Sequence, residues 1–113
     1  YLTRFVEIAK AKQMKLIFYR VKRRPDDTNV TVQSDALRDY TADFKAWAES
    51  QGCVHLDETD DPAITLSMFR DGDHLHEAVQ PAYTDLFLNR IRDHLPEPFT
   101  KTDIRAARQG QEP

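Results

Sequence analysis

Cysteine is almost absent from this sequence, which has one, Cys53, in 113 residues. A single cysteine cannot form an internal disulfide, so a small disulfide-stapled fold is excluded and Cys53 is expected to be a buried, inert thiol. Long apolar runs are also missing. The longest, residues 16–19, is far shorter than the roughly 20 apolar residues that a bilayer crossing needs, so we expect no membrane insertion by this segment.

A strong excess of charge of either sign is missing too. The formal net charge is -3, and apolar and charged residues make up 40% and 31% of the chain, as in ordinary globular domains. The one basic cluster, residues 22–24, has no aromatic residues interleaved in it. We therefore expect this cluster to be a solvated loop end and expect no nucleic acid partner. We also expect no cofactor.

The hydrophobic pattern predicts helices and strands in alternation. A continuous Leu-Ile-Phe-Tyr run inside residues 15–21 is typical of a strand buried on both faces, as in a parallel sheet. Ser34 is a good start for a helix that ends before Gly52, and its apolar stripe is expected to face the core. The stripe consists of Leu37, Tyr40, Phe44, Trp47 and Ala48. Further helices are predicted over residues 1–13 and 81–95, and a short strand over residues 53–57.

This order predicts an α/β domain with a parallel sheet over residues 1–95, followed by a polar tail or linker over residues 96–113. Two predicted strands are too few for a parallel sheet, whose faces and edges are normally covered. We therefore expect the remainder of the same polypeptide, or another chain, to complete the sheet. Because the sequence begins with Tyr1 rather than Met, the natural chain is expected to extend upstream.

The residues best suited to chemistry lie in the stretch Phe69-Arg70-Asp71-Gly72-Asp73-His74-Leu75. Here a carboxylate precedes a histidine by three residues, in a glycine-containing loop that is expected to lead into a helix. Such a carboxylate can hydrogen-bond one ring nitrogen of the histidine and leave the other nitrogen free. The histidine is then suited to accept the proton of a serine hydroxyl, as in a Ser-His-Asp triad.

The pattern Asp71-x-x-His74, with Leu75 after it and Tyr83-Thr84 opening a final helix, resembles the last motif block of the SGNH/GDSL hydrolases. The resemblance covers most of residues 1–95. It implies the C-terminal part of a three-layer α/β/α, flavodoxin-like domain in which His74 is the general base and Asp71 orients it. It further implies an ester hydrolase or O-acyltransferase that acts on a small-molecule or carbohydrate ester.

In that family the nucleophilic serine lies in a Gly-Asp-Ser motif near the start of the domain, and the oxyanion hole uses a later Gly-x-Asn-Asp motif. Ser34, Ser50 and Ser67 have no Gly-Asp-Ser context. We therefore expect the isolated chain to be inactive, with its serine supplied from upstream.

Two alternatives remain open. The chain can be a non-catalytic α/β interaction module, or a metal-dependent hydrolase that uses Asp71, Asp73, His74 and His76, which supply oxygen and imidazole ligands within six residues. A purely conformational explanation of the Asp-Gly pair is a solvated turn. His55 stands alone in the sequence and is expected on the solvent side of its strand.

Overall fold

The structure is a computed structural model, and it describes residues 1–95. The chain divides into two compact units, the first covering Tyr1–His74 and the second beginning at Leu75. The polar tail predicted for residues 96–113 lies outside the described residues. Within residues 1–95, no helix combines the length and the apolar character needed to cross a membrane.

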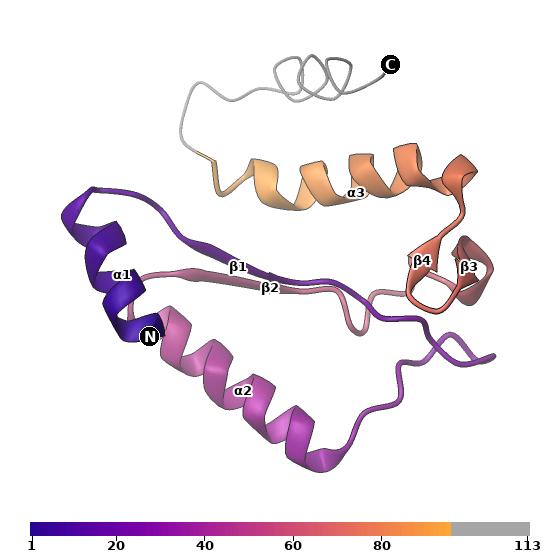
Figure 1. The fold of residues 1–113 in the computed structure, drawn as a ribbon, viewed down its shortest axis with the longest axis horizontal. Helices are drawn as coiled ribbons and strands as arrows, with labels where there is room; N and C mark the ends of the chain where they lie inside the picture. The colour runs from indigo at the N-terminus through magenta and orange to yellow at the C-terminus, as the bar shows by residue number, and fades with distance from the viewer. Residues whose placement is uncertain (96–113) are drawn as a thin grey trace. The chain divides into compact units, whose positions relative to one another are not determined.

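The first unit alternates helices and strands as the sequence predicts. Its elements are α1 (Leu2–Ala11), β1 (Ile17–Arg20), α2 (Asp35–Ser50), β2 (Val54–Asp57), the 3-10 turn Leu66–Met68 and β3 (Phe69–Asp71). Strands β1 and β2 lie side by side and run parallel, with Ile17 opposite Val54 and Arg20 opposite Asp57 (Figure 1). The chain is therefore a mixed helix and strand protein with a small parallel sheet.

Helix α2 begins and ends where its sequence signals predict. The Ser34 hydroxyl accepts a hydrogen bond of 3.1 Å from the backbone N–H of Leu37, which satisfies one of the free donors of the first turn. Gly52 follows the helix with a φ of +79°, a left-handed conformation that glycine adopts without steric cost. The helix is thus held between a capping serine and a glycine stop.

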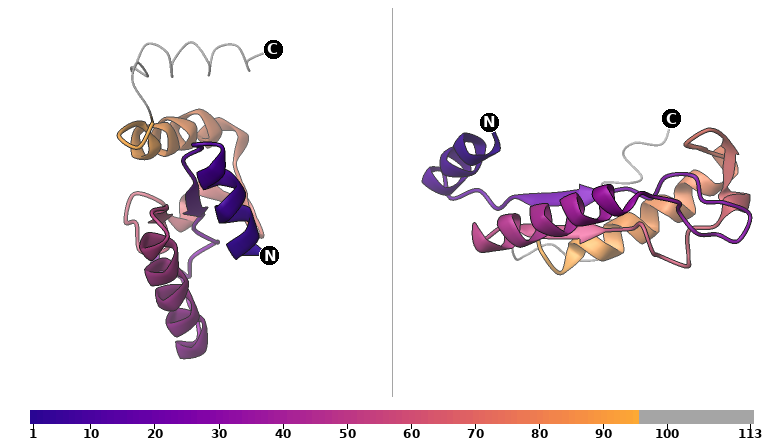
Figure 2. Two further views of the ribbon diagram at one scale, coloured as in Figure 1. Left: turned by 90° about the vertical axis from the view of Figure 1, so that its left-hand side faces the viewer. Right: turned by 90° about the horizontal axis from the view of Figure 1, so that it is seen from below.

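The same helix covers one face of the parallel sheet, as the right-hand view of Figure 2 shows. The ring of Phe44 lies 5.2 Å from that of Phe18 and 5.7 Å from that of His55, centroid to centroid. Phe18 and His55 are paired across the strands, so one aromatic side chain of α2 packs on both strands at once. His55 therefore faces the helix, and its expected place on the solvent side of the strand is wrong.

Three predictions about burial are also wrong. All four residues of β1 are half-buried rather than buried on both faces, and the parallel sheet that β1 forms has only two strands in residues 1–95. In the apolar stripe of α2 only Ala48 is fully buried, while Tyr40 is 67% exposed. Cys53 is half-buried rather than buried.

The segment around Asp71 forms a hairpin rather than a loop that leads directly into a helix. Asp71 is the last residue of β3, and His74 is the first residue of β4 (His74–Leu75). Gly72 opens the two-residue turn with a φ of +45°, the position at which a type II′ turn requires a left-handed residue. The second unit continues with the 3-10 turn Glu77–Val79 and then α3 (Gln80–Arg92), which confirms the last predicted helix.

Candidate functional site

The hairpin brings Asp71 and His74 into direct contact. The Nδ1 atom of His74 lies 3.0 Å from Oδ1 of Asp71, a hydrogen-bond distance. The geometry has a local cause, because a two-residue turn places the residues on either side of it opposite one another. The sequence predicted this contact, and the structure confirms it. Both side chains are open to solvent, with 60% of Asp71 and 83% of His74 exposed.

The contact favours an ionised Asp71, which is the state that can accept a hydrogen bond from His74. The hydrogen bond with His74 is the main cause that lowers the pKa of Asp71, and Arg70 and Arg24 add to it against a smaller opposing effect of burial. Asp71 is therefore a carboxylate near neutral pH. When Nδ1 donates to it, Nε2 of His74 is the ring nitrogen left to accept a proton.

Asp73, the second turn residue, fastens the hairpin to the segment that follows β1. Its Oδ1 accepts from the backbone N–H of Arg24 at 2.9 Å, and its Oδ2 accepts from Nε and Nη2 of Arg23 at 3.2 and 3.0 Å. The Arg24 N–H is the main cause that lowers the pKa of Asp73, with Arg23 second. Asp73 thus forms an ion pair with Arg23 and a hydrogen bond with the Arg24 backbone, and these contacts orient the hairpin.

The basic cluster of residues 22–24 is therefore more than the solvated loop end expected from the sequence. Lys22 is 6% exposed, and its Nζ donates to the backbone oxygens of Asn29 at 3.2 Å and Asp61 at 2.9 Å. Its own backbone N–H donates to the buried carboxylate of Glu58 at 3.0 Å. Two of the three basic residues hold loops together.

The metal alternative receives no support from the geometry. Throughout residues 1–95, no three His, Cys, Asp or Glu side chains gather in a way that could hold a metal ion, so Asp71, Asp73, His74 and His76 do not form the ligand set that this alternative would use. The serines also have structural partners. Ser34 caps α2, and Ser50 donates to the Trp47 carbonyl at 2.6 Å.

A second group of polar side chains lies at the carboxyl ends of β1 and β2. We call it the carboxyl-edge site. It surrounds a cavity of about 330 Å³ lined by Arg20, Gln33, Arg38, Thr41, Ala42, Lys45, His55, Asp57 and Asp60. Arg20 and Asp57 are the last residues of the two strands and are paired in register. The cavity lies on the sheet face that α2 covers.

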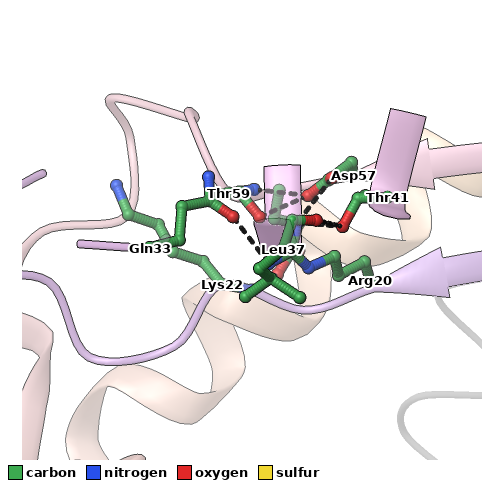
Figure 3. A network of polar contacts seen from close by, with 8 residues as sticks. Arg20, Lys22, Gln33, Leu37, Thr41, Asp57 and Thr59 are labelled. Atoms are coloured by element: carbon green, nitrogen blue, oxygen red, sulfur yellow. Dashed lines mark hydrogen bonds and ion pairs between the residues drawn. The ribbon is translucent and has the colours of Figure 1, made fainter. Parts of the chain in front are cut away.

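Arg20 is the centre of this network, as Figure 3 shows. Its Nη1 donates to Oδ2 of Asp57 at 3.2 Å and to the Thr41 hydroxyl at 3.4 Å, and its Nη2 donates to Gln33 at 3.0 Å. Burial raises the pKa of Asp57, but hydrogen bonds from Thr59 and attraction by Arg20 outweigh it, so the pKa is lowered overall. The guanidinium is therefore held by acceptors from three separate segments.

No sequence motif predicted the carboxyl-edge site. Its members come from β1, the following loop, α2 and β2, and they meet only once the strands are paired in register. One general feature of the predicted strands does point to this edge of the sheet. Ligands of open α/β sheets bind beyond the carboxyl ends of the strands; Asp57 ends the second predicted strand, and Arg20 lies one residue before the end of the first.

Comparisons of the chain with protein-family models, with curated proteins and with solved structures each give no match.

Proposed function

We propose that this chain supplies the acid-base pair of a serine-dependent ester hydrolase or O-acyltransferase that acts on a small-molecule or carbohydrate ester. The observation that carries the proposal is the 3.0 Å contact between Asp71 and Nδ1 of His74. It is the contact that a triad of this kind requires between its acid and its base. The resemblance of the Asp71 to His74 pattern to the SGNH/GDSL hydrolases supports the same assignment.

In the proposed reaction, Nε2 of His74 accepts the proton of a serine hydroxyl while the serine oxygen attacks the ester carbonyl. Asp71 stabilises the imidazolium through Nδ1 and does not itself become protonated. His74 then gives the proton to the departing alkoxide, which leaves an acyl-serine. Water or a second hydroxyl attacks this ester, loses its proton to His74, and the serine recovers that proton as it leaves.

The proposal requires a serine from outside residues 1–113, and the exposure of the Asp71–His74 pair fits that requirement. A histidine that is 83% exposed is open to a covering segment that brings the hydroxyl to Nε2. The sheet of β1 and β2 also supports an additional segment, since each of its strands has an unpaired edge in residues 1–95 that further strands could cover. We propose that the remainder of the same polypeptide, or another chain, completes a three-layer α/β/α domain of the flavodoxin-like, SGNH type.

The direct test is hydrolysis of p-nitrophenyl acetate by a polypeptide extended upstream of Tyr1. His74→Ala should lower kcat/KM by about 10⁴-fold, as loss of a triad member does, and Asp71→Asn by a similar or smaller factor. His76→Ala is the matched control, since it removes an exposed imidazole two residues away, and should leave the rate within about twofold.

Residues 1–113 alone should show no turnover. Full activity in the extended His74→Ala protein would end the triad assignment. Turnover by residues 1–113 that His74→Ala abolishes would instead contradict the claim that the serine is supplied from elsewhere.

One observation favours a non-catalytic interaction module as a second candidate. Helix α1 buries Val6 and Ala9, yet Leu2, Phe5 and Ile8 are 43%, 56% and 42% exposed. Apolar side chains spaced three apart on one helix face are typical of a surface that contacts another segment. The two candidates differ in upstream sequence, because only the enzyme needs a Gly-Asp-Ser followed by a Gly-x-Asn-Asp.

A further inference from the structure

We propose that the carboxyl-edge site binds a small oxyanion, the phosphate or carboxylate group of a soluble metabolite. The inference goes beyond the proposed ester chemistry and does not depend on it, since neither Asp71 nor His74 lines this cavity. It has three independent supports: the orientation of Arg20, two further cations on one face of α2, and a buried ring nitrogen of His55.

Arg20 is presented to the cavity in a fixed orientation. Its three acceptors take both N–H groups of Nη1 and one of Nη2. A guanidinium has five N–H donors, so the Nε–H and the second Nη2–H are left for a ligand. A held guanidinium loses little side-chain freedom when it binds a two-oxygen anion, which is why arginine is favoured at such sites.

Arg38 and Lys45 add positive charge on the same side of α2. They are seven residues apart, about two helical turns, and both line the cavity together with Thr41 and Ala42. Within residues 1–95 neither side chain has an ion-pair or hydrogen-bond partner. They are therefore cations whose charge is available to a ligand.

The carboxylates in the lining do not cancel this charge. Asp57 is already engaged by Arg20 and by the backbone N–H and hydroxyl of Thr59, at 2.8 and 2.5 Å. Asp60 is the other acidic residue of the lining. Three cations thus face two carboxylates, one of which already accepts three hydrogen bonds, and an anion is the ligand that balances the set.

His55 supplies the third support. Its Nδ1 atom is buried and has no hydrogen-bond partner, whereas its ring is held at 5.7 Å from the ring of Phe44. His55 is one of the residues that line the cavity, and buried polar atoms are nearly always hydrogen-bonded, so the unpartnered Nδ1 indicates a partner that residues 1–95 do not supply. A ligand oxygen, or a water that bridges to one, has the required chemistry.

The test is a titration of residues 1–113 with inorganic phosphate and, separately, with acetate, followed by ¹H-¹⁵N NMR at constant ionic strength. Saturable shifts are expected for the amides of Gln33, Thr41 and His55. Arg38→Ala/Lys45→Ala should weaken phosphate binding by about tenfold, the loss expected for two charge-assisted contacts. Arg4→Ala/Lys12→Ala is the matched control, because it removes two cations from the α1 region and should change the affinity by less than about twofold.

The two ligands separate the two sources of the oxyanion. Tighter binding of phosphate assigns the site to a phosphate group, and tighter binding of acetate assigns it to a carboxylate. The proposal is overturned if sodium chloride alone reproduces the shifts, or if both double variants weaken binding equally, since either result means general charge screening rather than a site.

Discussion

The Asp71–His74 pair and the Arg20–Asp57 pair are both contacts between a carboxylate and a nitrogen-bearing side chain, at 3.0 and 3.2 Å, but they differ in sequence separation and in exposure. The first joins residues three apart across a turn, and its side chains are 60% and 83% exposed. The second joins residues 37 apart across a parallel sheet, and its side chains are 26% and 29% exposed. One contact depends on local chain geometry, the other on the fold.

We therefore expect the Asp71–His74 pair to matter for chemistry and the Arg20–Asp57 pair to matter for stability. An exposed ion pair is screened by water and adds little to folding, so the hairpin pair can be altered without loss of structure. The network at the carboxyl ends of the strands is partly shielded from water and bonded to buried groups, so substitutions there should lower the free energy of unfolding. The predictions that follow test this contrast from the largest effect to the smallest.

The largest loss of stability is expected at Glu58, which is 1% exposed and accepts hydrogen bonds from the Tyr19 hydroxyl and the Lys22 backbone N–H. Glu58→Ala leaves these donors buried without this acceptor and should lower the free energy of unfolding by about 3 kcal/mol. Urea titration measures the change. Glu49→Ala, on the exposed face of α2, should cost less than about 0.5 kcal/mol, and equal losses would contradict the assigned role of Glu58.

A smaller, acid-sensitive effect is expected at the Arg20–Asp57 pair. Because the folded-state pKa of Asp57 is lowered from 3.8, its contribution to stability is present above that value and is lost as the pH falls through the lower folded-state pKa. A double-mutant cycle with Arg20→Met and Asp57→Asn should give a coupling of about 1 kcal/mol at about pH 6. That coupling should shrink at about pH 2, and a coupling that is the same at both pH values would rule out the ionised pair as its source.

The smallest effect is a local one at Asp73. Asp73→Ala removes the three hydrogen bonds that join the hairpin to Arg23 and Arg24. Backbone amides of residues 71–75 should then exchange with solvent several-fold faster, while the urea midpoint stays unchanged, since the opening is local. Asp27→Ala is the control in an exposed loop. Unchanged exchange in the Asp73 variant would mean that the turn is held by its own geometry alone.

The parts of the structure that could be predicted are those set by short-range patterns. Ser34 and Gly52 marked the ends of α2, and the Leu-Ile-Phe-Tyr run marked β1, because caps and hydrophobic periodicity act within a few residues. The Asp71 to His74 contact belongs to the same class. The sequence also indicated the parallel pairing, since a helix separates the two strands.

The parts that were missed depend on contacts between distant segments. The half-burial of β1 and the place of His55 under α2 depend on which faces are covered, which a single-strand pattern does not specify. The carboxyl-edge site needs the register that sets Arg20 opposite Asp57. A hairpin forms instead of the predicted loop because of Gly72. A first turn residue with positive φ favours a reversal of the chain over direct entry into a helix.

The central claim is that Asp71 holds His74 with Nδ1 protonated and Nε2 free to accept a proton. Long-range ¹H-¹⁵N NMR of the imidazole measures this tautomer directly. The measurement is made on residues 1–113 at a pH where the ring is neutral. The account predicts the Nδ1–H form for His74, and a shift toward the Nε2–H form in Asp71→Asn. An Nε2–H tautomer in the unaltered chain, or a tautomer that Asp71→Asn leaves unchanged, would contradict it.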